Sequence, residues 1–191
     1  MSLDGTGYLR VDAAKTLASG MPTGDSSYTL AAFAQKTSHT RGGVIGWGNY
    51  GSSGQVSAFR TGNNETLTNY SWSGAYDIDF VPAPSLLDGM WHHLATTYDS
   101  VTSTKHIFFD GLLVGSKVVP DLGVFGADFS LGKTHGTEYF NGLLDDVRVY
   151  DAPLSAAQIR GLAMVSVPEP STFLLFGLGL TAIAFRRRGK R

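Results

Sequence analysis

The feature that most constrains the fold of this chain is a series of short, β-rich segments between Leu3 and Val149. Clusters of Gly, Asn, Asp and Ser separate these segments, and the series lacks the 3.6-residue apolar period of amphipathic helices. Short strands at close spacing with frequent turn residues are typical of β-sandwiches. The sequence therefore predicts an all-β fold of two packed antiparallel sheets.

Two segments make this prediction specific. Residues 28–35 (YTLAAFAQ) have apolar side chains on both faces, as expected for a central strand. Asp110-Gly111 separates IFF from LLVG, and both central residues of a tight type I′ turn need positive φ. This dipeptide therefore predicts a hairpin of two neighbouring antiparallel strands. Further strands are predicted at residues 91–98, 129–132 and 144–150, the last with Val147 and Val149 on one face.

One short helix is predicted after the last strand. Ser155 is a good N-cap, and Gln158, three residues further on, completes a capping box. Leu154 and Ile159 occupy the two positions of a hydrophobic staple. The helix is expected to end between Gly161 and Met164.

Composition excludes several functional classes and divides the chain in two. The 191 residues include no cysteine, which excludes disulfides, thiolate nucleophiles and Cys-ligated zinc. A net charge of −1 gives no general electrostatic reason to expect nucleic-acid binding. Five of the fifteen Lys and Arg residues lie in the last six positions, which leaves ten basic against fifteen acidic residues in 1–165. We therefore treat residues 1–165 as one domain and residues 166–191 as a separate tail.

The tail has the composition of a short membrane segment. Residues 173–185 (FLLFGLGLTAIAF) are all apolar or small, and a basic cluster follows directly. As a helix this run rises about 20 Å, less than the roughly 30 Å of a hydrocarbon core, so flanking residues and snorkelling arginines must extend it. Basic residues remain on the cytoplasmic side, which predicts export of the domain. The basic cluster and two internal glycines disfavour a buried C-terminal core helix.

The order of VPEPS at 167–171, an apolar run and a terminal basic cluster resembles the PEP-CTERM sorting signal of Gram-negative, exopolysaccharide-producing bacteria. This resemblance implies processing by an exosortase near Pro168, Glu169 and Pro170, where two prolines keep the chain extended. It also implies membrane attachment through the tail before processing, and an outer-surface or extracellular-matrix location afterwards. Proteins of this group normally begin with an export signal, whereas Met1 to Leu3 leads directly into a predicted strand.

The rest of the chain carries a second resemblance. The segments DGMWHHLATTYDS, IFFDGLLVGS, FSLGKTHG and YFNGLLDDVRVYDAPLSAAQIRGL follow one another as in the laminin-G-like group of the concanavalin A-like lectin and glucanase superfamily. LDGTGYLRV resembles the opening strand of that group. The resemblance covers roughly residues 3–164 and implies a jelly-roll sandwich of two curved antiparallel sheets, one of them concave.

The residues expected of a related glucanase are missing. Retaining enzymes of the superfamily use a Glu-x-Asp-x-x-Glu pattern, and the only similar stretch, YDIDFV at 76–81, lacks both glutamates. We therefore expect no catalytic residues. Asp77 and Asp79 are two residues apart, which places them on one strand face and leaves a degenerate hydrolase as an alternative.

Calcium is the only metal that the sequence favours. His92 and His93 are adjacent in a predicted strand, so their side chains point to opposite faces and do not chelate one ion. The resemblance implies a structural Ca²⁺ that joins the first and last strands. The corresponding oxygen donors are Asp4, Gly43 and Asp146. The alternative is that Asp146 solvates the strand or pairs with Arg148.

A sugar site needs aromatic faces together with amide or carboxylate groups. Residues 62–84 are rich in both, and a second Gly-rich loop adds an aromatic residue. The alternative is that these aromatic residues fill the core. The predicted carbohydrate-binding residues are Trp47, Asn69, Tyr70, Trp72, Tyr76 and Asp77.

The sequence thus predicts an exported binding module without catalytic activity. Its expected ligand is an exopolysaccharide or another surface glycan, and its expected processing partner is an exosortase. A structural or adhesion module that binds proteins is the first alternative, and the degenerate hydrolase is the second.

Overall fold

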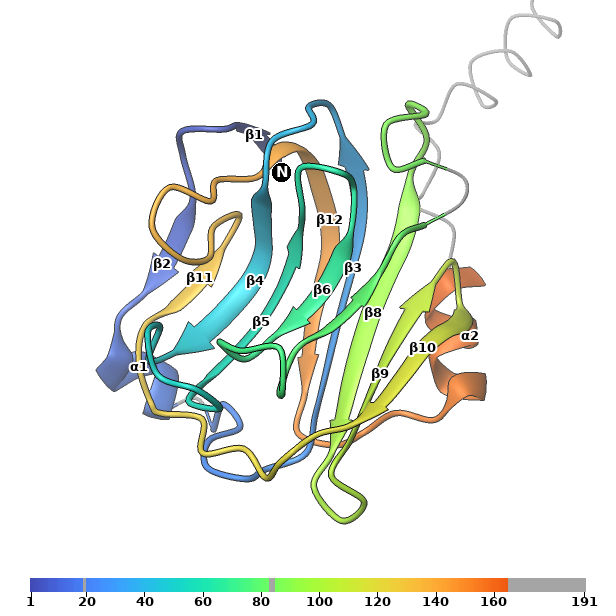
Figure 1. Ribbon diagram of the computed structural model, residues 1–191. Helices are drawn as coiled ribbons and strands as arrows, with labels where there is room; N and C mark the ends of the chain where they lie inside the picture. Colours follow the sequence, from blue (N-terminus) through green and yellow to red (C-terminus); the bar gives the residue numbers. More distant parts are fainter. Residues whose placement is uncertain (19, 83–84, 165–191) are drawn as a thin grey trace, which may run out of the picture.

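The computed structural model describes residues 1–18, 20–82 and 85–164, and every structural statement below refers to these residues. They form two six-stranded antiparallel sheets packed face to face (Figure 1). The first sheet has the order β1 (Ser2–Asp4), β12 (Asn141–Tyr150), β3 (Tyr28–Lys36), β8 (His92–Asp99), β9 (Thr104–Phe109) and β10 (Leu112–Val118). The second sheet has the order β2 (Leu9–Val11), β11 (Phe129–Leu131), β4 (Gly42–Gly48), β5 (Val56–Thr61), β6 (Leu67–Tyr70) and β7 (Ile78–Phe80).

The core lies between the two sheets. Tyr28 and Tyr98 from the first sheet and Trp47 from the second are fully buried there, and Tyr28 packs edge-on against Trp47 at 5.9 Å between ring centroids. Burial of side chains of this size stabilises the fold by about 2–3 kcal/mol each. The all-β sandwich predicted from the turn-rich sequence is confirmed.

Several local predictions are confirmed. Strand β3 lies between β12 and β8, as expected of a segment that is apolar on both faces. Asp110 and Gly111 both have positive φ (49° and 77°) and join the antiparallel pair β9 and β10. Arg148 donates to Asp146 and Tyr150, so these polar residues share the face opposite Val147 and Val149.

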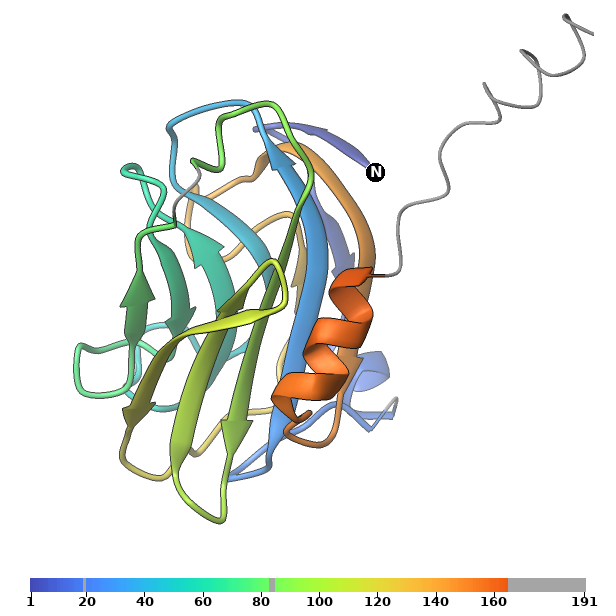
Figure 2. The same ribbon diagram turned by 90° about the vertical axis from the view of Figure 1, so that its right-hand side faces the viewer.

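The predicted helix is α2 (Ala156–Met164). The capping box forms, because the Ser155 amide donates to Gln158 Oε1 and the Gln158 amide donates to Ser155 Oγ. Ile159 is fully buried against Ala31, Ala95 and Phe108. Helix α2 therefore covers the outer face of the first sheet (Figure 2).

The N-terminal region differs from the sequence prediction. The segment expected to be one opening strand is split into β1, which pairs with β12, and β2, which pairs with β11 in the other sheet. A short helix, α1 (Ala13–Ala18), follows and was not predicted. Strand β12 begins at Asn141, three residues earlier than expected. Gly5 has a φ of +84°, which suits the sharp turn between the two sheets.

The predicted C-terminal hydrophobic helix and the processing residues Pro168, Glu169 and Pro170 lie outside the described residues. Within residues 1–164, apart from the gaps at 19 and 83–84, no helix has the length and apolar character needed to cross a membrane.

Candidate functional site

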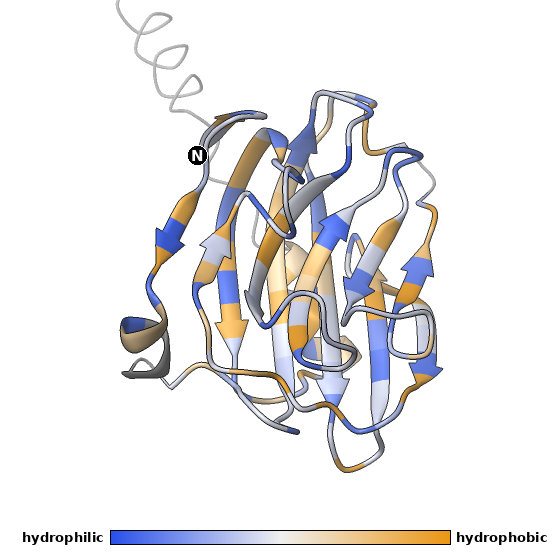
Figure 3. Cartoon of the chain, turned by 60° about the vertical axis from the view of Figure 1, so that its left-hand side comes forward, coloured by the Kyte–Doolittle hydropathy of each residue, from blue (hydrophilic) through white to orange (hydrophobic). Residues whose placement is uncertain are grey.

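Within the part of the chain that the structure describes, no helix covers the outer face of the second sheet, and we call it the open face (Figure 3). Strand register places Tyr70 opposite Ala58, Ala58 opposite Gly46, and Gly46 opposite Ser130. Arg10 of β2 pairs with Ser130 at the end of this row. Strands β2, β11, β4, β5 and β6 thus all contribute to one continuous surface.

The loop of residues 133–139 lies directly on this face. The Gly43 amide donates to the Glu138 carbonyl at 3.0 Å, and Thr134 packs where a side chain of residue 43 would be. A Cβ atom on Gly43 would come within 2.2 Å of the Thr134 nitrogen. The glycine is therefore required for the close approach of loop and sheet.

Glu138 anchors the loop through its carboxylate. Arg60 contacts both oxygens (3.0 and 3.2 Å), Thr134 Oγ1 donates to Oε2 at 2.7 Å, and Arg41 reaches Oε1 at 3.4 Å. The Arg60 and Glu138 side chains are only about 15% exposed, so water screens their attraction less than at the surface. The Arg60 guanidinium also lies 3.9 Å above the centre of the Tyr70 ring.

Four aromatic rings gather beside this ion pair, and we call them the aromatic cluster: Tyr50, Tyr70, Trp72 and His135. Burial raises the pKa of Tyr70 to about 12, although the nearby Arg60 charge lowers it in part. Burial likewise raises the pKa of Tyr50. Both tyrosines therefore remain neutral hydrogen-bonding groups at physiological pH.

Trp72 has an unusual backbone for so large a residue. Its φ is 71°, in the left-handed region that bulky side chains rarely occupy. Its ring meets His135 edge-on at 4.7 Å and Tyr70 at 5.9 Å between centroids, and the residue is partly exposed. Strained backbone of this kind concentrates at binding and catalytic sites.

Two clefts lie on the two sides of the 133–139 loop. The first has a volume of about 470 Å³, and the second a volume of about 550 Å³. Both linings combine polar and apolar surface, and their hydroxyl and charged groups can hydrogen-bond a polar ligand. The first cleft is lined by residues that include Tyr8, Arg10, Tyr50, Asp128, Ser130 and Lys133. The second is lined by Thr40, Arg41, Asn63, His135, Gly136, Thr137 and Glu138.

The six predicted sugar-binding residues fall into three groups. Tyr70 and Trp72 lie on the open face, within the aromatic cluster. Trp47 and Asn69 lie in the core, where the Trp47 indole donates to the Pro22 carbonyl and Asn69 bonds to Tyr28 and Thr96. They are inaccessible to a ligand, and their proposed role is revised accordingly.

The other two candidates lie away from the aromatic cluster's surface. Tyr76 packs against the core and against Gly54. Asp77 accepts a hydrogen bond from the Ser71 amide at 2.6 Å, and burial raises the pKa of its carboxyl group. Asp79 instead accepts from Thr68, so the two carboxylates have different hydrogen-bond partners. Asp77 precedes β7, and the strand period does not apply to it.

Sequence analysis missed the charged residues of the open face: Arg10, Arg41, Arg60, Lys133 and Glu138. They come from four separate segments, and no local pattern links them. The FSLGKTHG motif at 129–136 contains the first four residues of the loop, but the contact of Glu138 with Arg60 depends on tertiary packing.

The predicted calcium ligands do not fit a single ion. Asp4 lies opposite Asn141 on β12, whereas Asp146 is five residues further along that strand, a separation of roughly 15 Å. Asp4 Oδ1 accepts hydrogen bonds from Thr6 and Gly7, and Asp146 Oδ1 accepts from Arg148 at 2.7 Å. Calcium needs its oxygen ligands within about 2.6 Å, which two residues so far apart do not meet. Asp146 instead pairs with Arg148, the alternative stated above.

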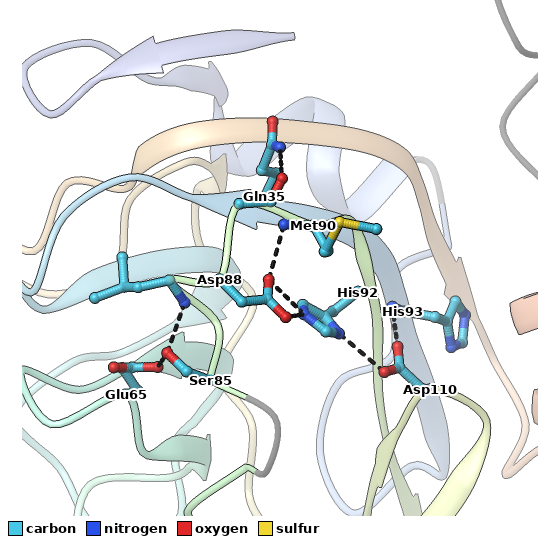
Figure 4. Close-up of polar contacts among 10 residues, drawn as sticks. Gln35, Glu65, Ser85, Asp88, Met90, His92, His93 and Asp110 are labelled. Atoms are coloured by element: carbon cyan, nitrogen blue, oxygen red, sulfur yellow. Dashed lines mark hydrogen bonds and ion pairs between the residues drawn. The ribbon is translucent and has the colours of Figure 1, made fainter.

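A separate polar cluster surrounds His92 at one end of the sandwich (Figure 4). Its Nδ1 lies 2.9 Å from Asp110 Oδ2, and its Nε2 lies 3.2 Å from Asp88 Oδ1. His93 points to the opposite face and packs on Phe33, and burial lowers its pKa to about 4. The expectation that these adjacent histidines diverge is confirmed. Both carboxylates beside His92 also accept backbone amides, which ties the 85–90 turn and the β9–β10 hairpin to β8.

The fold and the open face define a lectin-like β-sandwich. Residues 3–160 match the model of the concanavalin A-like lectin/glucanases superfamily, and the chain belongs to this superfamily. Residues 166–188 match the PEP-CTERM protein-sorting motif. Both resemblances seen in the sequence are therefore confirmed.

Comparison with individual proteins supports the fold. The IT-sialidase CBM40 of Ruminococcus gnavus bound to alpha2,3 sialyllactose superposes with a TM-score of 0.65 at 17% identity, over 85% of this chain and 94% of that one. Domain 4 of AbnA, a GH43 extracellular arabinanase of Geobacillus stearothermophilus, in complex with arabinotriose, gives 0.63 at 22% identity, over 85% and 75%. Identities this low show the fold alone.

A curated relative matches a shorter segment. It is the sushi, von Willebrand factor type A, EGF and pentraxin domain-containing protein 1 of Rattus norvegicus, which is 31% identical over 97 residues. The match covers 45% of this chain and spans 3% of the relative's length.

Proposed function

We propose that the protein is an exported module that binds glycans on its open face and does not cleave them. The observation that carries this proposal is the position of Trp72. Its ring lies on the open face and contacts His135, which lines the second cleft, at the cost of a left-handed backbone. Aromatic rings beside hydrogen-bonding groups suit the apolar faces and hydroxyls of sugars.

Two structural neighbours support a glycan ligand. The CBM40 module is bound to alpha2,3 sialyllactose, and domain 4 of the arabinanase to arabinotriose. Both resemble this chain in fold over most of its length. They support sugars as the ligand class. The identity of the sugar depends on the residues of the open face.

Binding without hydrolysis is favoured by the structural hydrogen bonds that the candidate acids make. A retaining glycosidase needs two carboxyl groups about 5 Å apart, one on each side of the bond to be cleaved. Asp77 and Asp79 bond to different partners, Ser71 and Thr68. Glu138 is held by Arg60 and Thr134 and acts in this proposal as an anchor of the loop.

The sorting motif supports the cellular part of the proposal. The match at residues 166–188 favours export from a Gram-negative bacterium, membrane attachment through the tail and processing by an exosortase near Pro168, Glu169 and Pro170. The mature domain is then delivered to the outer surface or the extracellular matrix, where surface polysaccharides are available as ligands.

Replacement of Trp72 tests the binding proposal. Trp72→Gly removes the ring but retains, without strain, the left-handed backbone, so fold and binding can be separated. We expect affinity on a glycan array or in polysaccharide pull-down to fall at least about tenfold, while the melting temperature stays within a few degrees.

Tyr150→Ala is the matched control, because Tyr150 lies in β12 of the first sheet. Equal binding by wild type and Trp72→Gly would refute the assignment of the open face. Failure of the wild type to bind any glycan, together with capture of a purified surface protein, would favour the adhesion alternative instead.

A further inference from the structure

The open face differs in charge from the rest of the domain. Residues 1–165 contain ten basic and fifteen acidic residues. Four of the ten basic residues line or flank the two clefts (Arg10, Arg41, Arg60 and Lys133), against two acidic ones, Asp128 and Glu138. Asp79 lies further out, on the edge strand β7. The face on which we propose glycan binding is therefore locally positive on a negative domain.

In the first cleft the cation is Lys133. Its ammonium group lies 4.6 Å from the centre of the Tyr8 ring and 4.7 Å from that of Tyr139. Two aromatic faces hold the charge in place but do not neutralise it. Arg10, in the same cleft, is paired with Asp128. Among the described residues no carboxylate forms an ion pair with Lys133, so its charge is available to a ligand.

In the second cleft the cation is Arg41. Its side chain is 49% exposed, and its contact with Glu138 is long at 3.4 Å. The same carboxylate already accepts two contacts from Arg60 and one from Thr134. Arg41 is therefore poorly compensated, and its planar guanidinium is suited to bind a carboxylate in two-pronged fashion.

The two clefts are close neighbours. Thr134 lines the first and Glu138 the second, and the hydrogen bond between their side chains is 2.7 Å long. A single turn of chain thus separates two sites that each present one available cation among sugar-compatible polar groups. One extended ligand that crosses the loop would meet both cations.

From this arrangement we propose that the ligand is an acidic polysaccharide, bound along its length, whose carboxylates meet Lys133 and Arg41 on the two sides of the 133–139 loop. This inference rests on the proposed glycan-binding function. It adds the chemical class of the glycan and the mode of binding, because a terminal sugar would fill one cleft only.

The test compares polygalacturonate with the same polymer after carboxyl reduction, which removes the charge and keeps the sugar backbone. The full-length chain is expected to bind the acidic polymer more tightly, with an affinity that falls as salt is added. Galacturonic acid monomer should bind far more weakly than the polymer, since it engages one cleft.

Charge variants locate the contact. Lys133→Gln and Arg41→Gln should each weaken binding to polygalacturonate about fivefold, as expected for the loss of one partly exposed ion pair, and leave binding to the reduced polymer unchanged. Lys133→Arg, which keeps the positive charge, should bind polygalacturonate as the wild type does. Lys15→Gln and Arg160→Gln are matched controls with the same loss of charge on α1 and α2.

The possible results separate this inference from the proposed function. Equal binding of both polymers, lost in Trp72→Gly but not in the charge variants, would overturn the acidic-ligand inference and keep glycan binding. Binding to neither polymer, nor to any other glycan, would overturn both. Binding of duplex DNA as tight as that of polygalacturonate would show unspecific attraction of polyanions and would also overturn the inference.

Discussion

Lys105 is an ionisable residue in a fully buried position. It is fully buried between the sheets, and its Nζ donates to Ser71 Oγ at 2.6 Å. Burial lowers its pKa to about 7, although the nearby Asp77 carboxylate opposes this shift. The unfolded chain, with an ordinary lysine pKa near 10.4, therefore binds more protons than the folded protein between about pH 7 and pH 10.

Stability should consequently rise with pH across that interval, by at most about 1.4 kcal/mol per pH unit from this group. Below about pH 7 the full penalty for burying the charge applies. Lys105→Met is expected to raise the free energy of unfolding at pH 6 by about 1–4 kcal/mol and to flatten the rise above pH 7.

Urea unfolding followed at several pH values measures both effects. Lys15→Met, on the exposed side of α1, is the control and should change neither. A variant at position 105 that is destabilised equally at pH 6 and pH 9 would show that the Ser71 hydrogen bond outweighs the cost of the buried charge.

At the scale of single elements, α2 depends on one side chain. Ile159 is its only fully buried residue and lies in a small cluster with Ala31, Ala95 and Phe108, separate from the main core. Ile159→Ala should cost about 2–4 kcal/mol through lost burial and the cavity left behind. The melting temperature should fall by roughly 5–15 °C.

Limited proteolysis shows whether the loss is local. We expect cleavage near α2 to become faster in Ile159→Ala, while binding to glycans on the opposite sheet is unchanged. Arg160→Ala, at an exposed position of the same helix, provides the comparison. If Ile159→Ala both loosens α2 and abolishes glycan binding, the outer faces of the two sheets are not independent.

At the scale of the whole molecule, the sandwich contains its own core. Among the described residues, the three hydrophobic clusters extend from Leu3 to Leu162, and β1 and β12 bring the start and end of the domain together. A chain that ends at Val165 should therefore melt cooperatively, within a few degrees of the full-length protein. Differential scanning calorimetry of both chains measures this, and loss of the transition in the shorter chain would place part of the domain in the tail.

The sequence predicted the architecture well because its signals are local. The Asp110-Gly111 turn, the capping box at Ser155 and the doubly apolar strand at 28–35 each depend on residues that are neighbours in the chain, and the structure contains all three. The two family resemblances rest on motifs that follow one another in a fixed order and are equally clear. The first strands were harder to predict, because a turn at Gly5 divides one apparent strand between the two sheets.

The residues of the candidate site could not all be predicted from local sequence patterns. Trp47 and Trp72 are both tryptophans near Gly-rich turns, yet one fills the core and the other lies on the open face. Strand alternation determines which residues share a face but not which face meets the other sheet. A bulge between Gly43 and Ile45 interrupts the alternation within β4, so the face of each residue there does not follow from the sequence.

The amino-acid sequence alone determined the class of fold and the sorting motif, because turn chemistry, periodicity and composition act over short stretches of chain. Tertiary structure alone decided which surface is open and which charges lie on it. Arg60, Glu138 and Arg41 meet only after one strand and two loops, distant in the sequence, have folded together, and the available cations of Lys133 and Arg41 depend on that packing.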